Sequence, residues 1–277
     1  MVSMPVGNIT RGTTNANRLR RVDRWIQTWP ALRTTSDPLV IDLGYGASAA
    51  TPVELATRLR KTRAEVELLG LEIDPERVTI AKEELSRWEK EHLITSNQAQ
   101  GISFARGGFE IPVAKNRQPV VIRAFNVLRQ YDEPEVQGAW DMMVARLQPG
   151  GVLVEGTCDE IGRISSWIAI TTNGPQTLSI ALKLDTLEVP SIVAERLPKA
   201  LIHHNVPGEH IHEFLTALDR QWLTHAPLGS FGATQRWIAT AQGMKEAGWP
   251  IIGNKSRWRL GEITVAYEAV SANAKAN

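Results

Sequence analysis

The most constraining feature of the sequence is an alternation of short apolar runs with amphipathic segments between residues 38 and 156. The apolar runs predict five strands, at residues 39–44, 65–73, 101–108, 119–125 and 152–156. The segments between them predict helices, at about 52–63, 75–90 and 134–147. Runs that are apolar throughout are typical of strands buried on both faces. The order therefore predicts an α/β fold with a doubly wound, mostly parallel sheet.

Other segments surround this predicted sheet. Residues 1–36 predict a basic N-terminal arm with a helix at about 15–30, since six arginines and one acid lie between Arg11 and Arg33. Residues 157–230 predict an insertion made of a β-hairpin and helices, which we interpret as a lid over an acceptor site. The core is expected to comprise residues 37–156 and 231–270. Residues 271–277 predict a disordered tail.

The composition narrows the class of protein. Lys and Arg number 31 against 30 Asp and Glu, so the whole chain has no strong attraction to nucleic acid or to an anionic membrane. Cys158 is the single cysteine, which excludes a disulfide within the chain. No apolar run approaches the roughly 20 residues that span a bilayer, and the first residues lack the apolar stretch of a secretory signal. These features favour a cytoplasmic enzyme or binding protein.

The motif after the first strand carries the main functional signal. It reads Asp42-Leu43-Gly44-Tyr45-Gly46-Ala47-Ser48-Ala49. Gly44 allows a sharp turn, and Gly46 lets a ligand approach the backbone at the start of a helix. The pattern G-x-G-x-x-A also occurs in dinucleotide-binding proteins. Glu72 ends the second strand, where a carboxylate can accept hydrogen bonds from a ribose diol, so it favours an adenosyl ligand without choosing between NAD and S-adenosylmethionine.

Three features favour S-adenosylmethionine. The carboxylate of Asp42 suits a cationic group better than a pyrophosphate, which it would repel. Asn126 follows the fourth strand, and Pro149-Gly150-Gly151 precedes the fifth. As a set, these residues resemble the class I S-adenosylmethionine-dependent methyltransferases, over residues 38–156 and again over 234–270. The resemblance implies a seven-stranded Rossmann-like sheet, S-adenosylmethionine as cofactor, S-adenosylhomocysteine as product and methyl transfer as the reaction.

The resemblance also implies which residues hold the cofactor. They are Asp42, Gly44, Tyr45, Gly46, Glu72, Ile73, Gly108, Phe109, Phe125 and Asn126. The sequence departs from the family's pattern at Ser48, which replaces the third glycine of the loop. It also lacks an acid after the third strand, where Gly107-Gly108-Phe109-Glu110 stands. Arg123 lies inside an apolar strand, so we expect a buried ion pair with Asp42 or Glu110.

The acceptor is less constrained than the cofactor. We predict that Arg129, Tyr131 and Trp167 contact it, and we name no catalytic residue, because methyl transfer needs a base only when the acceptor must lose a proton. A small molecule is favoured over RNA, although Arg18, Arg21 and Arg24 on the N-terminal helix could contact phosphates. Five histidines between 203 and 225 predict exposed or capping side chains and no metal site.

Two other functions stay open at this point. One is an NAD(P)-dependent oxidoreductase, which the pattern from Gly44 to Ala49 also fits. The other is a non-catalytic sensor of an adenosyl ligand, suggested by the missing acid after the third strand and by the absence of a recognisable base. The acceptor's identity and the oligomeric state do not follow from the sequence.

Overall fold

The structure, a computed structural model, describes residues 4–10, 12 and 15–272. It divides into two compact units. The first runs to Glu155 and includes the short stretches Glu160–Gly162 and Ile170–Gly174. The second consists of Gly156–Asp159, Arg163–Ala169 and the chain from Pro175 onward. Residues 273–277 of the predicted tail lie outside the described part of the chain.

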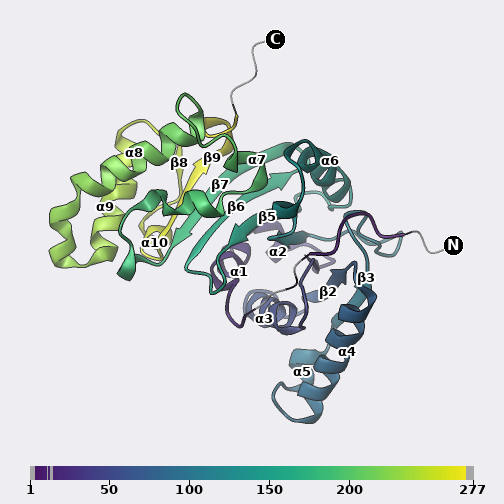
Figure 1. The fold of residues 1–277 in the computed structure, drawn as a ribbon. Coiled ribbons are helices and arrows are strands. Elements are labelled where there is room, and N and C mark those ends of the chain that lie inside the picture. The colour runs from purple at the N-terminus through teal and green to yellow at the C-terminus, as the bar shows by residue number, and fades with distance from the viewer. Residues whose placement is uncertain (1–3, 11, 13–14, 273–277) are drawn as a thin grey trace. The chain divides into compact units, whose positions relative to one another are not determined.

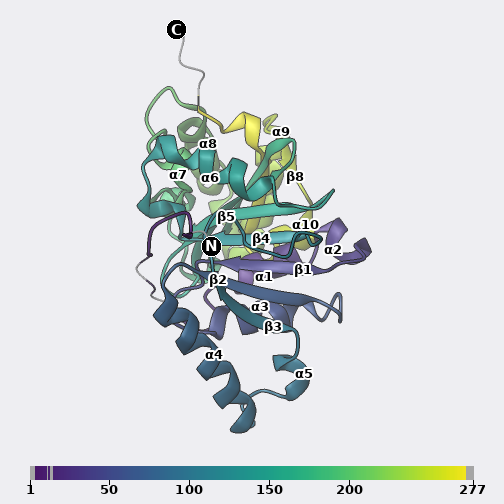
Figure 2. The ribbon, with the colours of Figure 1, turned by 90° about the vertical axis from the view of Figure 1, so that its right-hand side faces the viewer.

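The strands form a nine-stranded sheet with the order β3-β2-β1-β4-β5-β6-β7-β9-β8 (Figure 1). In Figure 2 the labels β5, β4, β1, β2 and β3 follow one another in that order. The strands are β1 Leu39–Leu43, β2 Glu67–Glu72, β3 Ile102–Arg106, β4 Val121–Phe125, β5 Val152–Cys158, β6 Ile164–Thr171, β7 Gly174–Leu182, β8 Ile251–Ile252 and β9 Glu262–Ala266. Strands β1 to β4 pair in parallel, whereas β9 runs antiparallel to β7 and β8.

The predicted doubly wound fold is confirmed, and the number of strands is corrected. Strand order reverses between β1 and β4, as it does in doubly wound sheets. Seven strands were expected, but β6 and β7, the strands of the predicted hairpin, hydrogen-bond into the same sheet. Their apolar residues are buried, so they extend the sheet beyond the parallel strands.

The helices of the first unit are α1 Arg20–Ile26, α2 Pro30–Thr34, α3 Ala50–Leu59, α4 Pro75–Lys90, α5 Ser96–Ala99, the 3₁₀ turn η1 Leu128–Gln130 and α6 Glu133–Val144. The predicted helix at 15–30 is shorter than expected. Trp29 has an extended backbone, because the ring of the following Pro30 disfavours the helical conformation there. A second, short helix then begins at Pro30.

In the second unit, α8 packs on α9, and α9 contacts β8 (Figure 1). Its helical elements are η2 Leu184–Thr186, η3 Pro190–Arg196, α7 Lys199–Ile202, α8 His210–Thr224, η4 Ala226–Phe231, α9 Ala233–Glu246, α10 Lys255–Trp258 and η5 Tyr267–Ala269. The rings of Trp222 and Trp237 lie 6.1 Å apart in its core. Across the described residues of both units, every helix is too short or too polar to cross a bilayer.

The start of α3 differs from the local signal in the sequence. Thr51-Pro52-Val53-Glu54 has the pattern of a capping box, but Thr51 lies inside the first turn. The capping group is Glu84 of α4, whose Oε2 accepts hydrogen bonds from the Ser48 hydroxyl at 2.8 Å and the Ala49 N–H at 2.9 Å. A carboxylate distant in sequence therefore accepts the Ala49 N–H at the start of this helix.

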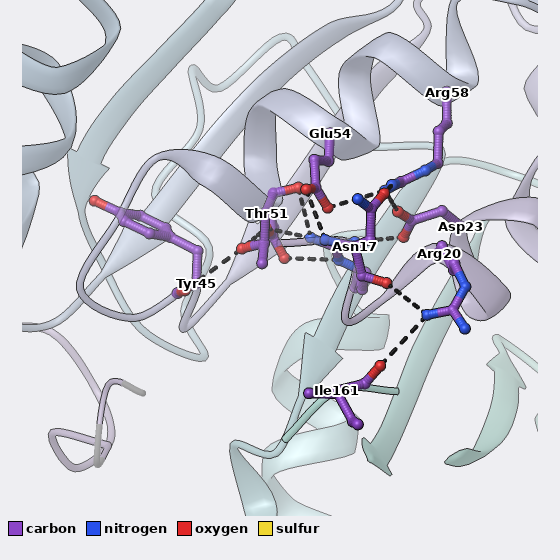
Figure 3. A network of polar contacts seen from close by, with 10 residues as sticks. Asn17, Arg20, Asp23, Tyr45, Thr51, Glu54, Arg58 and Ile161 are labelled. Carbon is purple, nitrogen blue, oxygen red and sulfur yellow. Dashed lines mark hydrogen bonds and ion pairs between the residues drawn. The ribbon is translucent and has the colours of Figure 1, made fainter. Parts of the chain in front are cut away.

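A buried ion network joins α1, α3, β1 and β4 in the first unit (Figure 3). Arg123 of β4 donates from Nε to Asp42 Oδ1 at 2.9 Å and from Nη2 to Asp42 Oδ2 at 2.5 Å. Its Nη1 lies 2.5 Å from Asp23 Oδ1, and Asp23 Oδ2 lies 2.5 Å from Arg58 Nη1. Burial opposes the charge on Arg123, but the two carboxylates more than offset this and raise its pKa. The predicted pair is therefore formed, with Asp42 as the partner.

Another buried ionisable group, Glu155, lies outside this network. Glu155 of β5 is fully buried, and neither carboxyl oxygen has a hydrogen-bond partner among the described residues. Burial raises the pKa of Glu155 from 4.5 to about 8. The side chain is therefore protonated in the folded protein at neutral pH.

We expect the substitution Arg123→Met to lower the free energy of unfolding by about 3–5 kcal/mol, because it removes the ion-pair partner of buried Asp42 and leaves Asp23 with Arg58 alone. Urea denaturation measures this loss. The control Arg87→Gln removes a largely exposed guanidinium that lies 4.0 Å from Glu84, and we expect a loss of about 1 kcal/mol or less. Equal losses in the two variants would contradict a structural role for the network.

We expect Glu155 to make stability depend on pH. Its pKa in the fold is raised. Between about pH 4.5 and 8, the folded chain therefore holds a proton that the unfolded chain has already released. The contribution of this group to the free energy of unfolding is complete below about pH 4.5. It falls by at most about 1.4 kcal/mol per pH unit up to about pH 8. Urea denaturation at several pH values should show this slope in the native chain and lose it in Glu155→Gln. The exposed control Glu83→Gln should retain the slope.

Candidate functional site

A small pocket lies where the strands of the first unit end. It is lined by Val6, Asn8, Thr10, Leu43, Gly44, Glu72, Ile73, Gly107, Gly108, Phe109, Val127 and Tyr131. These residues include the carboxyl ends of β1 and β2 and the segments that follow β3 and β4. Strand order reverses between β1 and β4, and ligands of doubly wound sheets bind at such a reversal. The fold therefore places this pocket where a ligand is expected.

The turn after β1 requires its two glycines. Gly44 and Gly46 have φ angles of +67° and +91°, which other residues adopt only with strain. A Cβ atom on Gly44 would lie 2.6 Å from the side chain of Val127. Gly44 therefore permits both the turn and the close approach of the segment after β4.

Glu72 is the acidic group of the pocket, and it is 1% exposed. Its Oε2 accepts a hydrogen bond from the Gly46 N–H at 3.2 Å, and its Oε1 accepts the N–H groups of Ile73 at 2.9 Å and Asp74 at 3.5 Å. Arg77 Nη1 lies 3.7 Å from Oε2. A carboxylate offers about four lone-pair sites, and these N–H groups take three of them, so Glu72 keeps capacity for one further donor.

Aromatic and aliphatic side chains form the other side of the pocket. The rings of Phe109 and Tyr131 lie 5.2 Å apart, and Ile73 follows Glu72 directly. Burial raises the pKa of Tyr131, although a hydrogen bond from the Asn8 N–H partly opposes the shift. Tyr131 is therefore a neutral phenol at physiological pH.

The chain's own N-terminal segment forms one side of the pocket. We call residues 4–10 together with Gly12 the N-terminal strap. Val6, Asn8 and Thr10 line the pocket, and the Tyr131 hydroxyl oxygen accepts the N–H of Asn8. The remaining cavity has a volume of about 10 Å³, which is room for roughly one water molecule.

Six of the residues predicted from the sequence line this pocket. They are Gly44, Glu72, Ile73, Gly108, Phe109 and Tyr131. Gly46 contributes through its hydrogen bond to Glu72. That these residues bind a ligand stays a prediction.

Two predicted cofactor residues have other partners. Both carboxylate oxygens of Asp42 are taken by Arg123, so its contacts indicate a structural role. The ring of Tyr45 points away from the buried network in Figure 3 and packs on Phe104, with ring centres 5.2 Å apart. Tyr45 turns this way because Gly70 leaves space beneath its ring. Burial raises the pKa of Tyr45, and its hydroxyl has no hydrogen-bond partner among the described residues.

The other predicted residues lie near the strand ends or elsewhere. Phe125 ends β4, and Asn126 follows with a φ of +59°, a strained conformation for a residue other than glycine. Arg129 belongs to η1. Trp167 belongs to β6 in the second unit and is fully buried. None of these four is among the residues that line the described pocket.

The sequence interpretation missed the strap and Leu43, and it did not name Gly107 and Val127 as cofactor residues, although both lie in segments that follow strand ends. The strap is held largely by main-chain atoms, which leave no pattern of side chains to recognise. The glycines at positions 7 and 12 were its one signal, since both have a positive φ.

The predicted histidine cluster lies in the second unit. His204 Nδ1 is 3.5 Å from Glu209, and His212 Nδ1 is 3.3 Å from the Asn205 side chain. In the part of the chain that the structure describes, no group of three or more His, Cys, Asp or Glu side chains could hold a metal ion.

No protein-family model matches the sequence, and no curated protein matches it either. Solved methyltransferase structures are similar to about half of the chain. One is the magnesium protoporphyrin IX methyltransferase of Synechocystis PCC 6803 with bound S-adenosylhomocysteine (TM-score 0.36, 16% identity, 50% of this chain and 55% of that one). Another is the N-methyltransferase NodS of Bradyrhizobium japonicum WM9 (TM-score 0.33, 20% identity, 50% and 66%). A third is the precorrin-6y C5,15-methyltransferase of Geobacter metallireducens GS-15 (TM-score 0.35, 14% identity, 54% and 66%). The matched part spans less than two thirds of each of these proteins.

Proposed function

We propose that this chain binds S-adenosylmethionine at the strand ends of its first unit and transfers the methyl group to a small-molecule acceptor. The observation that carries the proposal is the distribution of charge around the loop after β1. A buried carboxylate, Glu72, faces the pocket, and a second carboxylate, Glu84, occupies the N-terminus of α3. Glu84 repels a phosphate at the start of α3, and Glu72, with Arg77 at 3.7 Å, can accept a hydroxyl donor.

A nicotinamide dinucleotide is the alternative ligand, and the carboxylate at the N-terminus of α3 disfavours it. Such ligands place their pyrophosphate at the N-terminus of the helix that follows the glycine loop. Here Glu84 accepts the Ala49 N–H, and the Ser48 hydroxyl oxygen accepts the Ala50 N–H at 3.2 Å. The anion site is therefore filled by a negatively charged side chain of the chain itself. Since Arg123 compensates the charge of Asp42, the carboxylate that would repel a pyrophosphate here is Glu84.

The remaining groups of the pocket fit an adenosyl ligand. Glu72 has capacity to accept a hydrogen bond from one ribose hydroxyl, and Ile73 and Phe109 offer apolar surface for a base. Gly108 lacks a Cβ atom, so a ligand can approach the main chain beside Phe109. When bound, S-adenosylmethionine would supply a methyl group already activated by a positively charged sulfur.

The task of the chain's residues is then to align the reactants and exclude water. Tyr131 stays protonated because its pKa is raised, so it can hold an acceptor by a hydrogen bond but does not remove a proton. An acceptor that is nucleophilic without losing a proton, such as an unprotonated amine, requires no base from the pocket. For the RNA alternative, Arg20 and Arg21 already donate N–H groups to the main-chain carbonyls of Ile161 and Gly162, which leaves fewer donors for phosphates.

Calorimetric titration tests the ligand. We expect saturable binding of S-adenosylhomocysteine and no binding of NAD under the same conditions. Glu72→Gln should weaken the affinity by about tenfold to a hundredfold, since it replaces hydrogen bonds to a charged acceptor. The matched control Glu76→Gln alters an exposed acid in the first turn of α4 and should change the affinity by less than about twofold. Binding of NAD alone would contradict the proposal.

Transfer of a labelled methyl group tests the activity separately from binding. We expect incorporation of label into small molecules of a cell extract, and a much lower rate with Glu72→Gln at a donor concentration near its dissociation constant. Tight binding of S-adenosylhomocysteine without any incorporation would favour a non-catalytic sensor. Label found in RNA instead of small molecules would contradict the choice of acceptor.

A further inference from the structure

The N-terminal strap bonds to both ends of the pocket through its main chain. At one end, the Val6 N–H donates to the Glu110 carboxylate at 2.8 Å, and the Val6 carbonyl accepts the Phe109 N–H at 2.9 Å. At the other end, the Gly12 carbonyl accepts the Ala47 N–H of the loop after β1 at 3.0 Å. Between them, the Thr10 carbonyl accepts a hydrogen bond from Arg77 at 2.9 Å. The strap thus spans from the β3 end to the glycine loop.

Main-chain carbonyls of the strap lie against two glycines that a ligand would also contact, Gly108 and Gly46. A Cβ atom on Gly108 would lie 2.0 Å from the Val6 carbonyl oxygen, and one on Gly46 would lie 2.9 Å from the Gly12 carbonyl oxygen. Gly46 was predicted to let a ligand approach the backbone, and Gly108 was predicted to contact the cofactor. In this conformation strap carbonyls take the room beside both glycines.

The space that remains is too small for a nucleoside-sized ligand. Pockets for such molecules enclose about 300–1,000 Å³, whereas about 10 Å³ is left between the strap and the strand ends. The strap in this position and an adenosyl ligand therefore exclude each other.

The strap is packed less tightly against the protein than the residues of the core are. The side chains of Val6, Asn8 and Ile9 are exposed, and Ile9 is 55% exposed. Segments with few buried contacts and exposed hydrogen bonds open locally at a much lower cost than global unfolding. The strap can therefore leave the pocket while the sheet stays folded.

We propose that the N-terminal strap is an autoinhibitory segment that competes with S-adenosylmethionine for the pocket and must leave before the cofactor binds. The inference rests on the proposed function, because it takes the adenosyl ligand as the competitor. Apparent affinity falls in proportion to the fraction of molecules whose pocket is open. Opening the strap should therefore tighten binding without any change in the pocket itself.

The double variant Gly7→Ala and Gly12→Ala of the full chain tests this. Gly7 and Gly12 have φ angles of +130° and +74°, and a Cβ atom on each would lie 2.8 Å from the Tyr131 hydroxyl oxygen and 2.6 Å from the Arg77 guanidinium carbon. Both changes disfavour the closed strap and leave the strand-end residues intact. We expect S-adenosylhomocysteine to bind about tenfold more tightly in calorimetric titration. The control Ile9→Ala alters an exposed strap residue outside the pocket and should bind within about twofold of the native chain.

The outcomes separate the two proposals. Equal affinity in all three proteins, or weaker binding by the glycine variant, overturns the strap and leaves the proposed function standing. No binding by any of the three overturns the proposed function and the competition with it. Hydrogen exchange without ligand gives a second readout, because the amides of Phe109 and Ala47 are bonded to strap carbonyls. Both should exchange faster in the glycine variant, and unchanged exchange at both also overturns the strap.

Discussion

The buried guanidinium of Arg123 is the constraint on which the first unit depends. A charge with no exposed surface must be matched by carboxylates at hydrogen-bonding distance, or the fold loses several kcal/mol. Asp42 lies opposite Arg123 in the register of β1 and β4, so the parallel sheet supplies one carboxylate directly. The second, Asp23, comes from α1, which must therefore pack on this face. Thr51 completes the arrangement, because its carbonyl accepts Arg123 Nη2 at 3.2 Å and ties the start of α3 to the same cation.

This network changes the electrostatics at the strand ends. With Asp42 neutralised by Arg123, Glu72 is the carboxylate that acts on the pocket among its described lining residues. Glu84, at the first turn of α3, adds negative charge where dinucleotide-binding folds bind phosphate. The glycine loop therefore has the backbone shape of a phosphate site without its charge. Shape alone does not distinguish the two ligand classes, and the two glutamates supply the distinction.

The sequence predicted the parts that depend on local patterns. The apolar runs located β1 to β5, and Asp74-Pro75 located the start of α4, where the Asp74 side chain accepts the Glu76 N–H at 2.9 Å. Glu72 and Gly44 were placed in the pocket because strand ends meet at one edge of a parallel sheet. The cap of α3 could not be predicted, because Glu84 lies 35 residues after Ala49 and outcompetes the local Thr51 pattern. Tyr45 was assigned to the pocket by its place in the loop, but the space over Gly70 turns its ring elsewhere.

The same network also anchors the chain just after the N-terminal strap. Asn17, five residues after the strap's last described residue, donates its N–H to Glu54 at 2.7 Å, and its side-chain oxygen accepts Arg58 Nη2 at 2.5 Å. Arg58 is held in turn by Asp23. The strap is therefore tethered by a short link to the elements that carry the glycine loop. A short tether gives a segment a high effective concentration at its own site, on the order of millimolar. Even a weakly bonded strap can thus compete with a free ligand, and the strength of that competition depends on the buried arginine that fixes the tether.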